Sequence, residues 1–280
     1  MKTIQNIDCI AGLKKIQSNS IDCVLIDPPY NIKKDFGNNK DNLPLKEYVE
    51  WSKKWISESV RVLKDTGTIY IYGFSEILAH VSVNIPLEHR WLIWHYKNKT
   101  TPSLQFWQRS HESIIVAWKE DRIFNRDDVR EPYTETFLKN AAGKVRKNTK
   151  GRFGKKEGTV YTAHKNGALP RDVIEVSALA GGAGLKERFF YCKDCKESYF
   201  NIDLKEHEEH EIIQHPTQKP SKLTERLLMA CMPKGGTVLI PFVGSGAEIL
   251  VAKKLGMNYI GFDINNDYVL MAESILKKAG

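Results

Sequence analysis

The sequence predicts an α/β protein, with a mostly parallel sheet and a second region inserted into it. Short apolar runs typical of strands alternate with amphipathic helical segments at both ends of the chain. Between them, residues 119–214 are charged and Gly-rich and have no clear apolar period. The alternation resumes after His215, so we expect one α/β domain in two pieces, residues 1–118 and 215–280.

The first piece begins with a strand and a helix over residues 3–17, followed by a buried parallel strand at Asp22–Ile26. Two prolines come next, and because proline cannot continue a central strand, the chain leaves the sheet at Asp27. Leu45–Leu63 has the apolar spacing of an amphipathic helix, and Lys64–Gly67 is typical of a turn. Further strands are expected over residues 68–72, 91–96 and 113–118.

The second piece carries a Gly-rich turn at Pro241–Gly246, between an expected strand and an expected helix. Glycines there let the backbone approach a ligand, and the helix N-terminus presents free N–H groups. With Asp263 after the next strand, this is the order of a nucleotide-binding site, in which the acid bonds ribose hydroxyls. GxG alone is a weak signal, so a plain tight turn is the alternative. The elements expected in this piece cover residues 222–232, 238–240, 247–255, 259–262 and 268–278.

Composition and cysteine usage exclude several classes of protein. With 41% apolar and 27% charged residues, the chain is too apolar for a disordered protein and ordinary for a soluble one. It has no run of the ~18 apolar residues that a membrane span needs, and its first residues do not resemble a secretory signal. Of five cysteines only Cys192 and Cys195 are close together, so we expect no disulfide scaffold and a reducing, cytoplasmic location.

A strongly basic segment lies inside the insert. Residues 139–171 hold ten Lys or Arg and one acid, Glu157, so this segment carries +9 while the whole chain carries +8. Such a segment, with Gly and Asn interleaved, is typical of a loop that binds a polyanion; a merely solvated loop is the alternative. The residues expected to contact nucleic acid are Lys144, Arg146, Lys147, Lys150 and Arg152.

The tetrapeptide Asp27-Pro28-Pro29-Tyr30 follows a parallel strand, at the sheet edge where α/β proteins place their active sites. The Asp27 carboxylate and the Pro28 carbonyl would form a pair of acceptors beside an aromatic plate, Tyr30. Two acceptors suit an exocyclic amino group, which has two donors, and a plate suits a heterocyclic base. An ordinary Asp-Pro turn with a packed tyrosine is the alternative.

Taken together, these motifs resemble the β-class DNA amino-methyltransferases of the N6-adenine type, which use S-adenosylmethionine (AdoMet). Besides DPPY, the resemblance rests on His215–Pro220, which matches the family's HPTQKP, and on the Pro-Phe-Val-Gly-Ser-Gly turn. DPPY comes first, the basic insert second and the Gly-rich turn last, which is the permuted order of the β class. The family fold is a Rossmann-like sheet of seven mostly parallel strands with one reversed strand, and it requires the N-terminal strand to lie beside Tyr259–Phe262.

The resemblance also implies roles for individual residues. Residues 119–188 would be the target-recognition region. The catalytic residues would be Asp27, Pro28, Pro29 and Tyr30. The AdoMet-binding residues would be Asp8, Cys9, Thr217, Lys219, Phe242, Gly244, Ser245, Gly246 and Asp263.

The implied reaction is methyl transfer from AdoMet to N6 of an adenine flipped out of double-stranded DNA. Asp rather than Ser before Pro-Pro-Tyr favours adenine over cytosine. Three alternatives stay open: N4 methylation of cytosine in DNA, N6 methylation of adenine in RNA, and a catalytically weak DNA-binding subunit. The last is motivated by Ile240, where the family usually has Asp. A second copy of the chain and a cognate restriction endonuclease also stay open as partners.

Residues 189–214 are an addition to the family pattern, and they contain Cys192-x2-Cys195-x11-His207-x2-His210. Two Cys on a knuckle and two His on one helix face predict a tetrahedral Zn²⁺ site, as in a small zinc finger. The His spacing is one residue short of the usual minimum, so unliganded thiols and a redox pair are the alternatives. With four protein ligands, such a zinc would be structural rather than catalytic.

Overall fold

The computed structural model describes residues 2–34, 36, 41–98, 102–146, 159–160, 162–184 and 186–278. They fall into two compact units, Met1–Phe124 with Asp172–Gly280, and Asn125–Arg171. The smaller unit is shorter than the target-recognition region expected over 119–188, because the chain returns to the main sheet soon after Asp172. In the part of the chain that is described, no helix is long and apolar enough to cross a membrane.

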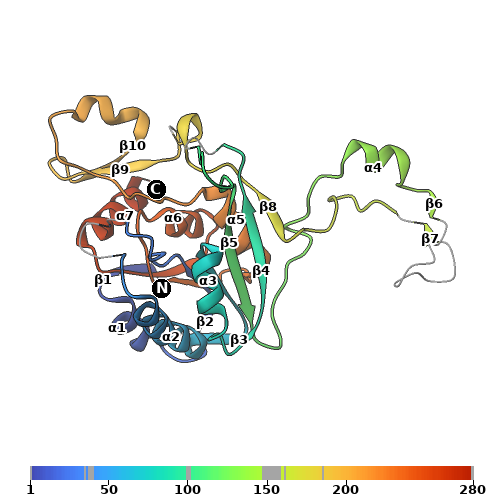
Figure 1. Ribbon diagram of the computed structural model, residues 1–280, viewed down its shortest axis with the longest axis horizontal. Helices are drawn as coiled ribbons and strands as arrows, with labels where there is room; N and C mark the ends of the chain where they lie inside the picture. The colour runs from blue at the N-terminus through green and yellow to red at the C-terminus, as the bar shows by residue number, and fades with distance from the viewer. Residues whose placement is uncertain are drawn as a thin grey trace. The chain divides into compact units, whose positions relative to one another are not determined.

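The larger unit is built on a sheet with the strand order β1-β13-β12-β2-β3-β5-β4-β8 (Figure 1). Strand β1 pairs parallel with β13, as the resemblance required, and β5 is the one reversed strand of this sheet. Among the described residues this sheet has eight strands where seven were expected, because the short strand β8 pairs with β4. The bounds are β1 Lys2–Asn6, β2 Ile21–Ile26, β3 Leu63–Gly73, β4 Glu88–His95, β5 His111–Trp118, β8 Val173–Glu175, β12 Thr237–Ile240 and β13 Asn258–Asp263.

Two groups of helices cover the faces of this sheet. Buried side chains of the first group, such as Leu13 and Trp55, share one apolar core, while Leu227 and Met271 of the second group belong to another. The central strand β2 is buried along its whole length, as its continuous apolar run predicts. The first group is α1 Cys9–Lys14, α2 Leu45–Val62 and α3 Ser75–Ser82; the second is α5 Ser221–Cys231, α6 Ala247–Lys254 and α7 Asn266–Lys278.

Two local expectations differ from the structure. Lys64–Gly67 is not a turn: β3 starts at Leu63, directly after α2, and a shift of register between Ile21 and Cys23 absorbs the irregular pairing. Helix α3 was not expected, because its eight residues are too short for a clear apolar period, although Leu78 and Val81 anchor it in the core.

Residues 189–213 form a small three-stranded sheet that packs on α7. Its strands are β9 Phe189–Cys192, β10 Glu197–Phe200 and β11 Ile212–Ile213, and the 3₁₀ helix η2 covers Asn201–His207. The Ser198 N–H donates to Ser274 Oγ at 2.7 Å, and its hydroxyl donates to the Met271 carbonyl at 2.9 Å. The element expected to bind zinc is therefore docked on helix α7 of the larger unit.

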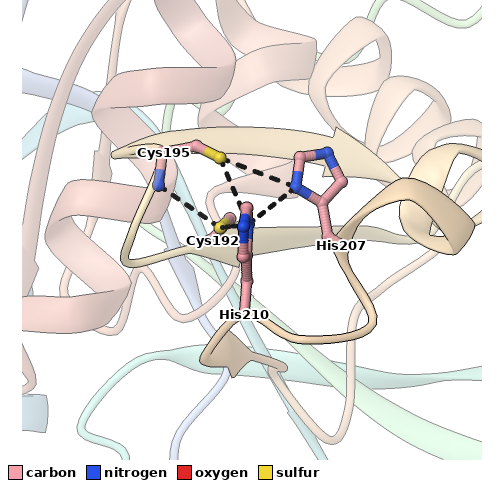
Figure 2. Close-up of side chains that lie close together, drawn as sticks. All are labelled: Cys192, Cys195, His207 and His210. Carbon is pink, nitrogen blue, oxygen red and sulfur yellow. Dashed lines mark hydrogen bonds between the residues drawn. The ribbon is translucent and has the colours of Figure 1, made fainter.

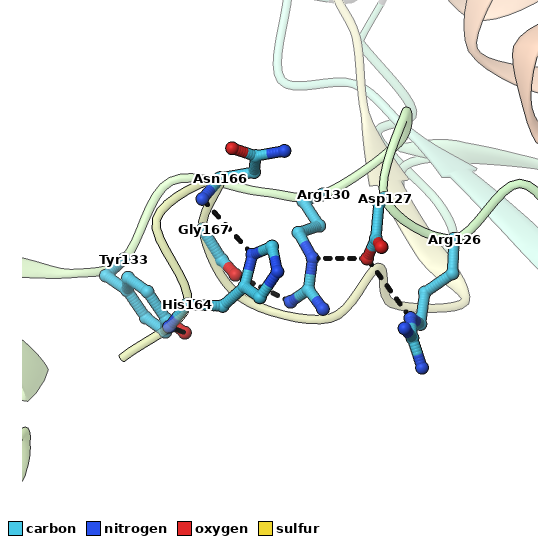
Figure 3. A network of polar contacts seen from close by, with 7 residues as sticks. All are labelled: Arg126, Asp127, Arg130, Tyr133, His164, Asn166 and Gly167. Atoms are coloured by element: carbon cyan, nitrogen blue, oxygen red, sulfur yellow. Dashed lines mark hydrogen bonds and ion pairs between the residues drawn. The ribbon is translucent and has the colours of Figure 1, made fainter. Parts of the chain in front are cut away.

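The smaller unit, Asn125–Arg171, contains α4 Glu135–Asn140 and the paired strands β6 Val145–Arg146 and β7 Thr159–Val160. A polar network joins residues 126–133 to residues 164–167 of this unit (Figure 3). Asp127 accepts from Arg126 and Arg130, and Arg130 also donates to the Gly167 carbonyl at 2.8 Å. Of the basic residues expected to contact nucleic acid, Lys144 and the backbone of Arg146 are described, whereas Lys147, Lys150 and Arg152 lie outside the described residues.

Candidate active site and metal centre

One pocket of about 200 Å³ joins the DPPY loop to the Gly-rich turn. The residues predicted from the sequence that line it are Asp8, Cys9, Asp27, Pro28, Pro29, Tyr30, Thr217, Lys219, Phe242, Gly244, Ser245 and Asp263. Gly246 is not among its lining residues. Its φ is +82°, and a Cβ there would lie 2.6 Å from that of Ala272, so this glycine permits close packing of the turn on α7.

Asp27 is held at the end of β2 by two buried donors. Its Oδ1 accepts from the Tyr30 hydroxyl at 2.9 Å, and its Oδ2 accepts from Lys219 Nζ at 2.7 Å. The Tyr30 hydroxyl also lies 3.1 Å from Glu112 Oε2, and Lys219 Nζ lies 4.0 Å from the same oxygen. Lys219, expected at the cofactor, lines this pocket and lies close to two carboxylates, those of Asp27 and Glu112.

The charges of this group depend on one another. Burial alone would lower the pKa of Lys219, but Asp27 and Glu112 outweigh it and raise that pKa, so the lysine stays protonated. Burial raises the pKa of Glu112, and Lys219 opposes the rise. Burial, with Asp27 and Glu112 adding to it, also raises the pKa of the Tyr30 phenol, which stays a hydrogen-bond donor.

Glu248 is a site residue that the sequence analysis missed. It lies in the first turn of α6, lines the pocket and is 4% exposed. Burial, with Asp27 adding to it, raises the pKa of Glu248 to about 8, so its carboxyl is neutral at pH 7. The signal available in the sequence was a lone acid among Ala247, Ile249 and Leu250, just after the Gly-rich turn.

We expect Glu248→Gln to stabilise the protein above pH 8 and to change little at pH 5, because the amide mimics the neutral carboxyl. The folded-state pKa of Glu248 lies above its ordinary 4.5, so its contribution to stability is complete below that pH and is lost as pH rises to about 8. Thermal unfolding at pH 5, 7 and 9 measures this, with a gain at pH 9 of at least ~1.4 kcal/mol, equivalent to one pKa unit. Parallel curves for the variant and the unmodified protein would contradict it.

The Gly-rich turn is anchored by Asp263. The Gly244 N–H donates to Asp263 Oδ2 at 2.7 Å, and the Asn265 N–H donates to Oδ1 at 2.8 Å. Gly244 has a φ of +50°, and a Cβ there would lie 2.7 Å from His215 Nε2, so only glycine fits. Ile240 stands where the family usually has an Asp, and it is buried in β12. The acid that bonds the turn is Asp263, on the neighbouring strand β13.

An aromatic wall lies behind the turn. Phe242 packs edge-on against Trp51 and Trp55 of α2, with ring centroids 5.7 and 6.2 Å apart. The Tyr48 hydroxyl, one turn earlier on α2, donates to the Pro29 carbonyl at 2.7 Å and so fixes the DPPY loop. Helical spacing predicts that these aromatic residues of α2 share one helix face, but it carries no signal that they belong to the site.

Asp8 and the HPTQKP segment complete the pocket. Asp8 caps α1, with its Oδ1 accepting from the N–H groups of Ile10 and Ala11 at 3.0 Å each. His215 packs against Tyr268, and burial, with Lys219 adding to it, lowers the pKa of His215 to about 3, so the ring is neutral. Gln218 bonds the Glu187 carbonyl and the Phe189 N–H, which ties this segment to the start of β9.

The four residues of the predicted metal site converge in space (Figure 2). Their ligand atoms lie within 4.8 Å of one another. His210 Nδ1 is 3.3 Å from Cys192 Sγ, 3.4 Å from Cys195 Sγ and 3.1 Å from His207 Nδ1. A tetrahedral zinc with ordinary bond lengths places S and N ligands about 3.5 Å apart and two N ligands about 3.3 Å apart. The cluster therefore has the size and the donor set of a structural zinc site.

The fold and the site can be compared with known proteins. A family model described as DNA methylase matches residues 21–274. The Type II methyltransferase M.HpaI of Haemophilus parainfluenzae is 30% identical over 96% of this chain and 72% of its own length. The DNA adenine methyltransferase YhdJ of Escherichia coli K12 is 28% identical over 96% of this chain and 81% of its own.

Solved structures share the fold at lower identity. The cytosine-N4-specific PvuII DNA methyltransferase has a TM-score of 0.62 at 16% identity, covering 97% of this chain and 85% of its own. The M1.HpyAVI–SAM complex has a TM-score of 0.57 at 17% identity, covering 98% of both chains. These two similarities show a shared fold over nearly the whole chain.

Proposed function

This chain belongs to the DNA methylase family, and we propose that it transfers a methyl group from AdoMet to N6 of an adenine flipped out of double-stranded DNA. The observation that carries the proposal is the single pocket in which the Asp27 carboxylate faces the same space as the Gly244 turn and Asp263. The likeness to YhdJ, described as an adenine methyltransferase, supports the choice of base.

The residues around the Gly-rich turn fit AdoMet. The adenosine part of AdoMet needs an apolar surface and acceptors for its ribose hydroxyls. Phe242 supplies the apolar surface, and the carboxylates of Asp8 and Asp263 supply the acceptors. Asp8 Oδ1 already accepts from two backbone N–H groups, which leaves Oδ2 to accept from AdoMet, and Asp263 Oδ2 can accept a second hydrogen bond beyond the Gly244 N–H. The M1.HpyAVI structure, which contains SAM on the same fold, supports this assignment.

When bound, AdoMet supplies the electrophilic methyl group. The adenine N6 lone pair is delocalised into the ring, so it needs help to attack. Asp27 and the Pro28 carbonyl accept hydrogen bonds from the two N6 hydrogens and favour a pyramidal nitrogen whose lone pair is free to attack. Lys219 donates a hydrogen bond to Asp27 Oδ2 and so holds that side chain in place. Tyr30 offers a ring against which the base stacks.

Tritium transfer from labelled AdoMet tests the activity, with DNA, RNA and no nucleic acid as the three arms. Label in DNA alone, recovered as N6-methyladenine after hydrolysis, is the expected result. N4-methylcytosine would establish a cytosine methyltransferase, and labelled RNA an RNA methyltransferase. Absence of label in all arms would favour the third alternative, a catalytically weak DNA-binding subunit. Modified-base sequencing of DNA from a methylation-free host that expresses the protein then maps the recognition sequence.

The basic segment is proposed to bind the DNA backbone. We expect Lys144, Arg146, Lys147 and Lys150, changed together to Gln, to weaken specific and non-specific binding alike. The slope of log affinity against log salt should flatten by about 0.9 for each phosphate that the variant no longer neutralises. Fluorescence anisotropy on one duplex over a range of salt measures the slope. A slope that stays unchanged would show that these charges only solvate the segment.

We also propose that Cys192, Cys195, His207 and His210 hold one structural Zn²⁺. Supporting this, the cluster joins the end of β9 to His207, the last residue of η2, and to His210 in the turn after it, so a metal there would link these parts of the small sheet. The spacing predicted that the two His share one helix face, but they do not, because η2 ends at His207. Residues 192–214 contain seven acidic residues and three lysines, so this element is a poor phosphate binder. Its proposed role is to brace α7, on which it packs.

A further inference from the structure

The loop between β4 and β5 carries an unusual exposure of large apolar side chains. Leu104 is 91% exposed, Trp107 87% and Phe106 79%, which makes them three of the four most exposed large hydrophobic residues in the described part of the chain. Single exposed apolar side chains are common, but three within four residues, two of them aromatic, mark a contact surface. We call Leu104–Trp107 the apolar tip.

The apolar tip stands beside the candidate active site. The two ends of the β4–β5 loop are held together by the Tyr96 N–H, which donates to the Ser110 carbonyl at 2.9 Å. Two residues after Trp107, the Arg109 guanidinium lies 4.0 Å from the centre of the Phe74 ring and pairs with Glu76. Phe74 in turn packs edge-on against Tyr30, with centroids 5.2 Å apart. The loop is thus anchored to Phe74, the residue that packs against the tyrosine of the DPPY motif.

From this geometry we propose that the apolar tip inserts into the DNA and fills the space that the flipped adenine leaves; the inference rests on the proposed function. Extruding a base costs a few kcal/mol of stacking and pairing. Apolar and aromatic side chains that enter a base step replace part of that stacking. Gln105 and Gln108 flank Phe106 and Trp107, and an amide both donates and accepts, which suits the edge of the orphaned partner base.

DNA fits the apolar tip better than a second copy of this chain. A stable protein interface buries at least ~1,200 Å² in total, which three side chains on one loop do not supply. Residues 102–110 contain no acid. Arg109 pairs with Glu76, so the charges at this end of the loop balance, and contact with DNA depends on the apolar and amide side chains of the tip.

The test uses Trp107→Ala and the double variant Phe106→Ala/Trp107→Ala in the full chain. Two duplexes carry the mapped recognition sequence, one with thymine opposite the target adenine and one with an abasic residue there. On the normal duplex we expect kcat/KM to fall about 10- to 100-fold, the range for losing one stacked aromatic. On the abasic duplex, where the adenine is already unpaired, the variants should come within about threefold of the unmodified protein. Trp107→Phe keeps a stacking ring and should lose less.

Val83→Ser is the matched control, because Val83 is 81% exposed at the end of α3 and belongs to no part of the tip. The fluorescence of 2-aminopurine at the target position reports flipping directly and should drop in the tip variants. Equal loss on both duplexes, or no loss on either, would overturn the inference. A change in oligomeric state with normal flipping would overturn it in favour of an interface between copies. Absence of methyl transfer by the unmodified protein would instead refute the proposed function.

Discussion

Asp27→Ala should slow methyl transfer by orders of magnitude while leaving AdoMet binding intact. The variant loses one of the two acceptors aimed at the amino group, and removing one such pre-positioned hydrogen-bonding group lowers turnover by about 10²–10³-fold. AdoMet binding should survive, because Asp8, Phe242 and Asp263 belong to other elements. Single-turnover tritium transfer and equilibrium AdoMet binding measure the two effects separately.

The same variant leaves Lys219 without its nearest carboxylate. Lys219 is 3% exposed, and removing one partner of a buried pair costs about 3–5 kcal/mol. Asp27→Asn keeps the shape and a hydrogen-bond acceptor, so it should fold better and still be slow. A matched control stands at the other end of β2, where buried Asp22 bonds Lys64 Nζ at 2.9 and 3.0 Å. Asp22→Ala should lower stability and leave methyl transfer unchanged; normal turnover by Asp27→Ala would refute the assignment.

The sequence was informative wherever a short motif sets its own geometry. Pro28 and Pro29 end a central strand by themselves, so Asp27 had to lie at the sheet edge. The place of β1 beside β13 followed from the order of motifs in the family. The charges around Asp27 could not be foreseen, because Lys219 comes from 192 residues away and only the folded sheet brings them together.

Ile240 shows the converse case. As a sequence feature it raised doubt, since the family usually has an acid at that position. In the folded protein Asp263 on the adjacent strand β13 bonds the Gly244 N–H, so the turn keeps its shape without an acid at 240. The Asp263 carboxylate can bond the turn and still offer lone pairs to a ribose. A sequence pattern cannot reveal this, because Asp263 and the turn lie on neighbouring strands that only the fold brings together.

The docking of the Cys/His element was equally hidden in the sequence. The Cys/His spacing predicted a metal site but not where the element packs, and in the structure Lys193 pairs with Asp267 of α7 at 3.3 Å. Lys278, at the other end of α7, pairs with Glu197 at 3.1 Å. Tyr268 of the same helix lines the pocket. The proposed metal would thus stabilise a helix that the active site uses.

Removing that metal should unfold residues 189–214 before the rest of the protein. The segment is short and strongly charged, so metal ligation is expected to supply most of its local folding energy. Chelation or Cys192→Ser should expose the segment to protease and lower the melting temperature, through the lost support of α7. AdoMet should still bind as long as α7 stays folded, because Asp8, Phe242 and Asp263 lie outside residues 189–214. The methylated base should not change, because the DPPY loop lies outside them as well. Cys231→Ser is the control, since Cys231 is 2% exposed in α5 and outside the cluster. Protein purified without a histidine tag should carry about one zinc per chain, and far less zinc with two freely titrating thiols would show that these four side chains gather without a metal.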